Sequence, residues 1–298
     1  MFDWNDLRFF LELARRGKLS AAALRLGVDH TTVARRIAAL EDKLGIALFD
    51  RANRLYSLSE HGRRLLRYAE KMEANSLALM DEVAPVVTGP VGTVRLATPE
   101  AIGSQFIARH CTSFHARNPS IALELVAETR QMSLSKREAD AAITLAKPAH
   151  GRMVSDKLGD YRLRLYASPV YLQNHPPIVR LGDLQNHHFI WYVDDLLPVP
   201  ELRILDKAIS HPNVIFRTTS VTGQANAAEA GLGIALLPCF VADSMRGLTT
   251  VLPREISIMR ELWLTVHQDL QPLAHMQRVC EFLQTLVTSE RPTLVGAR

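Results

Sequence analysis

The distribution of proline constrains the fold of this chain most strongly. All 15 prolines of the 298 residues lie at Pro85 or beyond, so the first 84 residues contain none. Because proline breaks helix interiors, a proline-free segment of this length is typical of a largely helical unit. Helix breakers are then concentrated in residues 85–92, which read Pro-Val-Val-Thr-Gly-Pro-Val-Gly. The sequence therefore predicts a small helical N-terminal part and a larger C-terminal part, joined at this hinge.

The excess of positive charge lies entirely in the first part. Residues 1–64 hold 12 of the 35 basic side chains and 8 of the 31 acidic ones, which leaves 23 of each in the rest of the chain. A small basic module joined to a neutral body favours a polyanionic partner for that module. On charge alone, a solvated surface is the alternative interpretation.

Several classes of protein are disfavoured by the sequence. The longest apolar stretch, residues 230–242, contains glycine and proline and is shorter than the ~20 residues that span a bilayer. No basic flank precedes an apolar run at the N-terminus, as a secretory signal would require. The three cysteines, Cys111, Cys239 and Cys280, fit no disulfide or zinc pattern. We expect a cytoplasmic protein with no cofactor, no metal site and no membrane contact.

Three helices are predicted in the first part. Apolar residues at helical spacing over 7–14 predict a first helix that Gly17 ends. Ser20 is a good N-cap for a short second helix over residues 21–26. A third helix is expected from about residue 30 to residue 44. Their apolar faces predict one small shared core.

The spacing of Ala23, Gly27 and Val33 is that of a helix-turn-helix, which needs a small residue, a turn residue and a branched apolar residue at these intervals. A second face of the third helix carries small and basic side chains, namely Thr32, Arg35, Arg36 and Ala39. Such a face fits the major groove of DNA, where arginine reads guanine and threonine meets a phosphate or a thymine methyl. The alternative is that the two arginines are ordinary surface charges.

Two loosely alternating stretches, residues 47–51 and 54–58, predict a two-stranded wing beside the third helix. Arg51 and Arg54 lie at its predicted tip. A wing in this place contacts the sugar-phosphate backbone or the minor groove.

A long helix is expected from Ser59, as its cap, towards Pro85. Its residues at alternating spacings of four and three form a heptad seam: Leu65, Ala69, Met72, Ser76, Leu79 and Val83. A second copy of the chain is the simplest partner for this seam, because dimeric proteins match two half-sites on DNA. Packing on the chain's own C-terminal part is the alternative.

The larger part alternates strand-like and helix-like stretches, which predicts open, mainly parallel sheets with helices on both faces. The expected strands are 93–98, 121–127, 141–145, 162–167, 189–193, 214–218, 234–237 and 263–267. Helices are expected at 105–116, 222–230 and 275–287. So many strands favour two lobes with a cleft between them.

Several motifs in order resemble the N-terminal domain of LysR-type transcriptional regulators: residues 7–10, 19–26, 33–41, 44–51 and 58–62. Residues 91–98, 165–171 and 230–238 resemble the effector domain of the same family. The resemblance implies an α/β chain with an N-terminal all-α winged helix-turn-helix, a linker helix and a two-lobed α/β domain like type 2 periplasmic binding proteins. The implied limits are 1–58, 59–88 and 92–298, with lobe I at 92–161 and 267–298 and lobe II at 162–266.

The resemblance also implies the function. It indicates a regulator that binds promoter DNA sequence-specifically as a homodimer or homotetramer and responds to a small-molecule effector held between the lobes. The expected DNA contacts are Ser20, His30, Thr31, Thr32, Arg35, Arg36, Arg51 and Arg54. Many family members have Ser-Gln where this chain has Asp29-His30, so we expect Asp29 to cap the third helix and His30 to be available to a base edge.

The effector pocket is expected where strand ends and helix N-termini of the two lobes converge, because free backbone N–H groups there attract anions. The candidate residues are Thr98, Glu100, Ala101, Thr144, Trp191, Ser220, Val221 and Thr222. Core packing is the favoured alternative for Trp191. A carboxylate at Glu100 argues against a simple anionic ligand or favours one with a donor group, unless it faces solvent.

Two other classes of protein, enzymes and solute-binding proteins, are disfavoured by the sequence. An enzyme is disfavoured because the chain has no His-Glu-x-x-His pair, no Gly-x-Ser-x-Gly elbow and no Gly-x-x-x-x-Gly-Lys loop, and the adjacent His187 and His188 are poorly placed for metal binding. A transporter's solute-binding protein would need export or an anchor. It would also leave the basic N-terminal module unexplained, so we expect a regulator that is not an enzyme.

Overall fold

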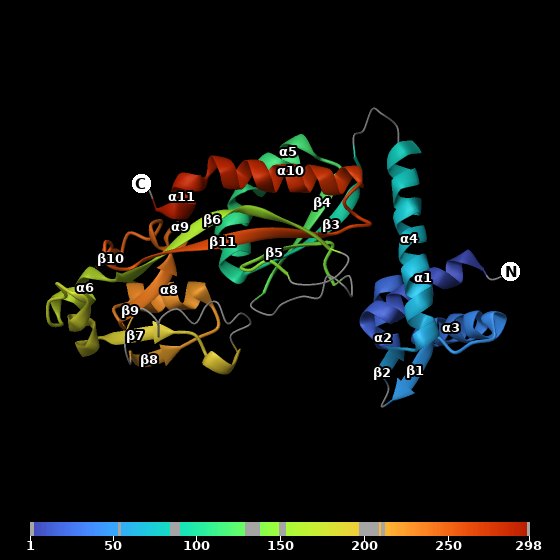
Figure 1. The fold of residues 1–298 in the computed structure, drawn as a ribbon, viewed down its shortest axis with the longest axis horizontal. Coiled ribbons are helices and arrows are strands. Elements are labelled where there is room, and N and C mark those ends of the chain that lie inside the picture. The colour runs from blue at the N-terminus through green and yellow to red at the C-terminus, as the bar shows by residue number, and fades with distance from the viewer. Residues whose placement is uncertain are drawn as a thin grey trace.

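The fold comes from a computed structural model that describes residues 3–52, 55–83, 90–128, 138–148, 153–196, 209 and 212–296. Figure 1 shows a small helical domain at the N-terminus and a larger α/β domain, connected at the far end of a long helix. Among the described residues, no helix has both the length and the apolar character needed to cross a membrane.

The N-terminal domain is a three-helix unit with a wing, as predicted. Its helices are α1 (Trp4–Arg16), α2 (Leu19–Leu26) and α3 (His30–Leu44). The wing is an antiparallel pair, β1 (Phe49–Ala52) and β2 (Leu55–Leu58). Phe10, Leu13, Val33, Ile37 and Leu40 form its core and are at most 1% exposed. Gly17 ends α1 with a φ of 66°, a conformation that glycine adopts without strain.

The start of α2 corrects one prediction. The helix begins at Leu19, with Lys18 as its N-cap residue, and Ser20 lies exposed in the first turn. Ala22 N already donates to Lys18 O at 3.1 Å, so the first helical hydrogen bond forms before Ser20 could act as a cap. The chain therefore enters α2 directly from the left-handed turn at Gly17.

The long helix α4 (Glu60–Val83) begins as predicted, because Ser59 Oγ accepts from Gly62 N at 2.9 Å. The two halves of its heptad seam have different surroundings. Leu65, Ala69 and Met72 pack against the core of the N-terminal domain. This half is therefore covered by neither of the two partners considered from the sequence.

The second half of the seam differs from the first. Ser76 is exposed, and Leu79 is 58% exposed. The side chain of Val83 lies outside the described part of the structure. An apolar residue as exposed as Leu79 on a projecting helix is available to a partner.

The described residues of the C-terminal domain include nine strands. These are β3 (Gly92–Thr98), β4 (Ile121–Ala127), β5 (Ala141–Thr144), β6 (Met153–Ala167), β7 (His188–Trp191), β8 (Asn213–Arg217), β9 (Ile234–Pro238), β10 (Thr249–Val251) and β11 (Ser257–His267). The sheet order is β4-β3-β5-β11-β6-β9-β7-β8, with β10 paired to β6. Strands β3, β4 and β5 belong to one lobe, and β7, β8 and β9 belong to the other.

The central strands correct the expected topology. Strand β11 pairs antiparallel with residues 153–164 of β6, and both strands run from one lobe into the other. Parallel pairing is confined to β3 with its neighbours β4 and β5 and to β7 with β8 and β9. The sheets are therefore not mainly parallel, and the two lobes share a continuous ladder.

Helices cover both ends of this sheet. The first lobe carries a helical stretch made of η1 (Ile102–Ile107), η2 (Ala108–His110) and α5 (Cys111–Arg117). The other lobe carries α6 (Pro169–Gln173), η3 (Leu181–Asn186), η4 (Asp194–Leu196), α8 (Val221–Glu229) and α9 (Cys239–Ala242). Helix α10 (Ala274–Ser289) packs on β3 and β6, and α11 (Arg291–Val295) ends the described chain. The expected helices at 105–116, 222–230 and 275–287 are present, with bounds that differ by one to three residues.

Candidate DNA-binding surface and interlobe site

Helix α3 presents one buried face and one exposed face. Val33, Ile37 and Leu40 pack into the core, whereas His30 and Arg35 are exposed on the other side. No ion-pair partner of Arg35 occurs in the part of the chain that the structure describes. The arrangement leaves a guanidinium free on the outer side of a helix that follows a tight turn, as DNA readout requires.

Asp29 is the N-cap of α3, as expected. Its Oδ1 accepts from Thr31 N at 2.7 Å and from Thr31 Oγ1 at 2.6 Å. These two hydrogen bonds lower the pKa of Asp29 below its ordinary value, because they stabilise the charged carboxylate. The cap fixes the start of the helix and orients Thr31, while Thr32 is half-buried.

Arg36 has partners within the domain. Its Nη1 lies 3.1 Å from Asp6 Oδ1 and 3.2 Å from Asp3 Oδ2, and its guanidinium lies 5.7 Å from the centroid of the Phe9 ring. Asp6 is only 1% exposed and also lies 3.7 Å from Lys43 Nζ. Arg36 therefore ties α3 to α1. This role of Arg36 could not be predicted from the sequence, because an acid in the first turn of a helix is common at the surface.

Arg51 lies in β1 of the hairpin, where a wing was predicted. Arg51 pairs in register with Tyr56 across the antiparallel ladder, although its side chain is not among those described. Arg54 lies outside the described residues. Figure 1 shows the wing projecting below the three helices, near the start of α4.

Two predicted loops meet between the lobes. Glu100 follows β3, and its carboxylate reaches the N-terminus of α8. Its Oε2 accepts from Val221 N at 3.1 Å and from Thr222 N at 3.4 Å, while its Oε1 accepts from Thr222 Oγ1 at 2.7 Å. The contact brings together three of the residues predicted for the effector site.

The other residues of these loops either have a structural role or are buried. Ser220 caps α8, because its Oγ accepts from Gly223 N at 3.0 Å. Thr98 and Ala101 are about 95% buried. Gln105, which sequence reasoning missed, donates from Nε2 to Thr222 Oγ1 at 3.4 Å. The sequence signal that could have indicated Gln105 was its position in the helical stretch that follows Glu100.

Thr144 and Trp191 are less suited to a ligand. Thr144 Oγ1 donates to Ala146 O at 2.8 Å, so its hydroxyl proton is already used. Trp191 is 3% exposed and packs edge-on against Tyr192, with ring centroids 5.3 Å apart. Burial, followed by the charges of Tyr161 and Glu100, raises the pKa of Tyr192. Tyr192 therefore lies near enough to Glu100 for the carboxylate to affect its pKa, and the sequence could not show this proximity.

A cavity of about 210 Å³ lies elsewhere, among β6, β11 and α10. Val154, Leu264 and Cys280 are among the residues that line it. Burial raises the pKa of Cys280 to about 11, so this thiol is protonated at neutral pH. The cavity is separate from the interlobe contact made by Glu100.

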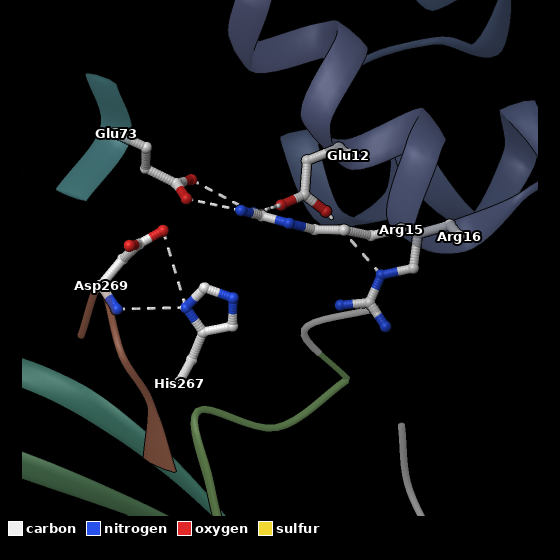
Figure 2. Close-up of polar contacts among 6 residues, drawn as sticks. All are labelled: Glu12, Arg15, Arg16, Glu73, His267 and Asp269. Carbon is white, nitrogen blue, oxygen red and sulfur yellow. Dashed lines mark hydrogen bonds and ion pairs between the residues drawn. The ribbon is translucent and has the colours of Figure 1, made fainter. Parts of the chain in front are cut away.

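The two domains also meet within the chain. Figure 2 shows Arg15 of α1 between Glu12 and Glu73, with Nη1 3.2 Å from Glu12 Oε1 and 3.1 Å from Glu73 Oε1. His267, at the end of β11, and Asp269 lie beside this network. Ligand atoms of His267, Asp269 and Glu70 lie within 4.8 Å of one another. Polar side chains of α1 and α4 therefore lie beside the end of β11.

Comparisons with known families agree with this architecture. The family described as "Bacterial regulatory helix-turn-helix protein, lysR family" matches residues 4–63. The family described as "LysR substrate binding domain" matches residues 88–287, which is about two thirds of the chain. Together the two families account for the winged domain and the two-lobed domain.

Individual proteins give the same assignment. An HTH-type transcriptional regulator of Xanthomonas campestris is 30% identical over 62% of this chain and 54% of its own length, so the match spans about half of that relative. The Mau operon transcriptional activator of Paracoccus denitrificans is 26% identical over 91% of this chain and 93% of its own. Full-length LysG from Corynebacterium glutamicum, solved with bound effector Arg, has a TM-score of 0.65 at 19% identity and covers 97% and 99% of the two chains.

The fold, the capped third helix and the matching domains together identify the type of protein. Both family descriptions apply to one chain in the expected order, with a helix-turn-helix domain followed by an effector-binding domain. The chain therefore belongs to the LysR family of transcriptional regulators.

Proposed function

We propose that this protein binds promoter DNA sequence-specifically as a homodimer or homotetramer in the cytoplasm, and that an effector bound between its lobes changes this binding. We also propose the domain limits 1–58, 59–88 and 92–298, with lobe I at 92–161 and 267–298 and lobe II at 162–266. The observation that carries the proposal is the outer face of α3, where Arg35 is exposed and free while Val33 and Ile37 anchor the helix.

The DNA contacts fall into two kinds. His30, Thr32 and Arg35 are proposed to meet base edges, and Arg36 remains a proposed contact although Asp6 holds its guanidinium. Ser20, Thr31, Arg51 and Arg54 are proposed to position the protein on the phosphates. Base contacts specify sequence, whereas phosphate contacts supply affinity that depends on salt.

The DNA proposal is tested with Arg35→Ala. If Arg35 reads a base, the variant should bind the promoter about 5- to 150-fold more weakly while keeping its affinity for random DNA. Gel-shift titrations of both DNAs at one salt concentration provide the measurement. Arg254→Ala, which removes an exposed arginine from the C-terminal domain, is the control and should bind as the wild type does. Equal loss on both DNAs would assign Arg35 to the backbone instead.

The effector proposal rests on the convergence of the loop after β3 with the start of α8. The structure of LysG carries a bound effector in a similar fold. A panel of small molecules screened by thermal shift should contain compounds that raise the Tm of the wild-type protein. Thr222→Phe should abolish that response and keep promoter binding, because α8 and α3 lie in different domains. An undiminished response would place the pocket elsewhere.

A further inference from the structure

We infer that Glu100 is a built-in carboxylate ligand, which fills the anion position at the N-terminus of α8 from the opposite lobe and holds the two lobes together without an effector. The inference rests on the proposed interlobe site and goes beyond it by naming what occupies this position. It also specifies the chemical class that the position accepts, a small carboxylate.

Both carboxylate oxygens of Glu100 accept hydrogen bonds from this chain. Oε1 accepts from Thr222 Oγ1 at 2.7 Å. Oε2 accepts from Val221 N at 3.1 Å and from Thr222 N at 3.4 Å. Ser104 Oγ lies 3.2 Å from Oε1, but its one proton is closer to the backbone oxygen of Glu100, at 2.8 Å. Three of the about four acceptor sites of the carboxylate are therefore filled by donors of the opposite lobe.

The first N–H donors of α8 all have hydrogen-bond partners. The first N–H groups of a helix have no partner within the helix and attract an anion. Here, Val221 N and Thr222 N donate to Glu100, and Gly223 N donates to Ser220 Oγ. Gln224 N begins the regular helical pattern by donating to Ser220 O at 3.0 Å. An external carboxylate can therefore bind here only by displacing Glu100.

The contact joins residues 121 positions apart that belong to different lobes. Charge-assisted hydrogen bonds of this kind are stronger than neutral ones, and the partial positive charge of a helix N-terminus favours the carboxylate further. This arrangement of the lobes is therefore stabilised by the chain itself. While Glu100 occupies the N-terminus of α8, an effector at the interlobe site is recognised through groups other than a carboxylate.

The test uses chemical rescue. Glu100→Ala retains Cβ and removes one carbon and the carboxylate, which together have the heavy atoms of acetate. The Tm of the full-length variant should fall below that of the wild type. At saturating sodium acetate, compared with sodium chloride at equal ionic strength, it should rise by about 2–4 °C. The wild type and Glu255→Ala, which removes an exposed carboxylate from the same domain, should show no such difference.

A second variant locates the rescue. In the Glu100→Ala, Thr222→Val double variant, the hydroxyl donor is missing, so most of the acetate effect should disappear. If Glu100→Ala does not fold in chloride, the refolding yield in acetate against chloride replaces Tm as the measurement. A larger yield in acetate is expected.

Two results would overturn the inference. Acetate could stabilise the wild type as much as Glu100→Ala, which would mean that Glu100 does not fill the position. Acetate could also have no specific effect on Glu100→Ala, which would mean that α8 binds no carboxylate. Either result leaves the proposed effector site to its own test with Thr222→Phe, so the two failures are distinguishable.

Discussion

Arg35 and Arg36 are adjacent arginines on one helix with different surroundings. Arg35 is exposed without an ion-pair partner, whereas Arg36 lies against the buried carboxylate of Asp6. Sequence patterning placed both on the same outer face, because helical spacing cannot show that Asp6, 30 residues earlier, turns towards Arg36. Two side chains on one helix face can therefore have different roles, one in contacting DNA and the other in stabilising the fold.

This difference predicts opposite phenotypes for two alanine variants. Arg36→Ala leaves the buried carboxylate of Asp6 with only the more distant Lys43, so it should lower the free energy of unfolding. The expected loss is about 1–3 kcal/mol, below the value for a fully buried pair because the Arg36 side chain is 36% exposed. Arg35→Ala should leave stability unchanged. Urea unfolding of both variants is the measurement, and equal stabilities would contradict the assigned role of Arg36.

The Asp29 cap predicts a pH dependence. Because its folded pKa is lowered, its contribution to stability is fully present above the ordinary aspartate pKa of about 3.9. That contribution is lost as the pH falls through the lowered value. Asp29→Ser keeps a cap that does not titrate. The Tm of this variant should therefore fall less than that of the wild type below about pH 4, and parallel curves would argue against the cap.

At the scale of elements, local signals predicted some boundaries well and others poorly. Helix α3 spans the predicted residues because Asp29 starts it and Gly45 ends it, both through local hydrogen bonds. Strand β6 extends nine residues before the predicted start at Arg162. That extension is rich in charge, and its pairing comes from distant β11, including an ion pair of Lys157 with Glu261 at 2.9 Å. Its sequence alone carries no strand pattern.

The interlobe site could also be predicted only in part from the sequence. The loops after β3 and before α8 could be predicted, because each is a strand end followed by a helix start. The bond between Glu100 and Thr222 could not be predicted, because it depends on how the two lobes sit together. Thr98 also differs from expectation: its Oγ1 lies 2.3 Å from where a Cβ on Gly103 would be, so the site is tightly packed.

The two halves of α4 have different surroundings, so we expect that the dimer interface can be disrupted without disturbing the N-terminal domain. Met72 packs into the N-terminal core, whereas Leu79 is exposed. Leu79→Asp should weaken the dimer, because it places like charges in an apolar seam, and it should leave the Tm of the dissociated chain unchanged. Asn75→Asp adds one charge at an exposed neighbouring position and is the control. Sedimentation equilibrium that shows the same assembly for both variants would exclude this half of the seam.

At the scale of the whole molecule, β6 and β11 connect the two lobes with the N-terminal domain. Both strands run through both lobes, and β11 ends at His267. There, His267 and Asp269 lie beside Glu70 of α4, next to the network of Arg15 with Glu12 and Glu73 (Figure 2). Neighbouring elements of one chain therefore lead from the lobes to the helix-turn-helix domain.

Sequence-specific DNA binding is tested most directly by the affinity of the full-length protein for DNA selected from its own genome. Bound fragments should share two half-sites about one helical turn apart. The protein should bind them at least about 1,000-fold more tightly than a scrambled fragment of the same composition at the same salt. Equal affinity for the selected and scrambled fragments would contradict the proposal that the protein reads DNA sequence.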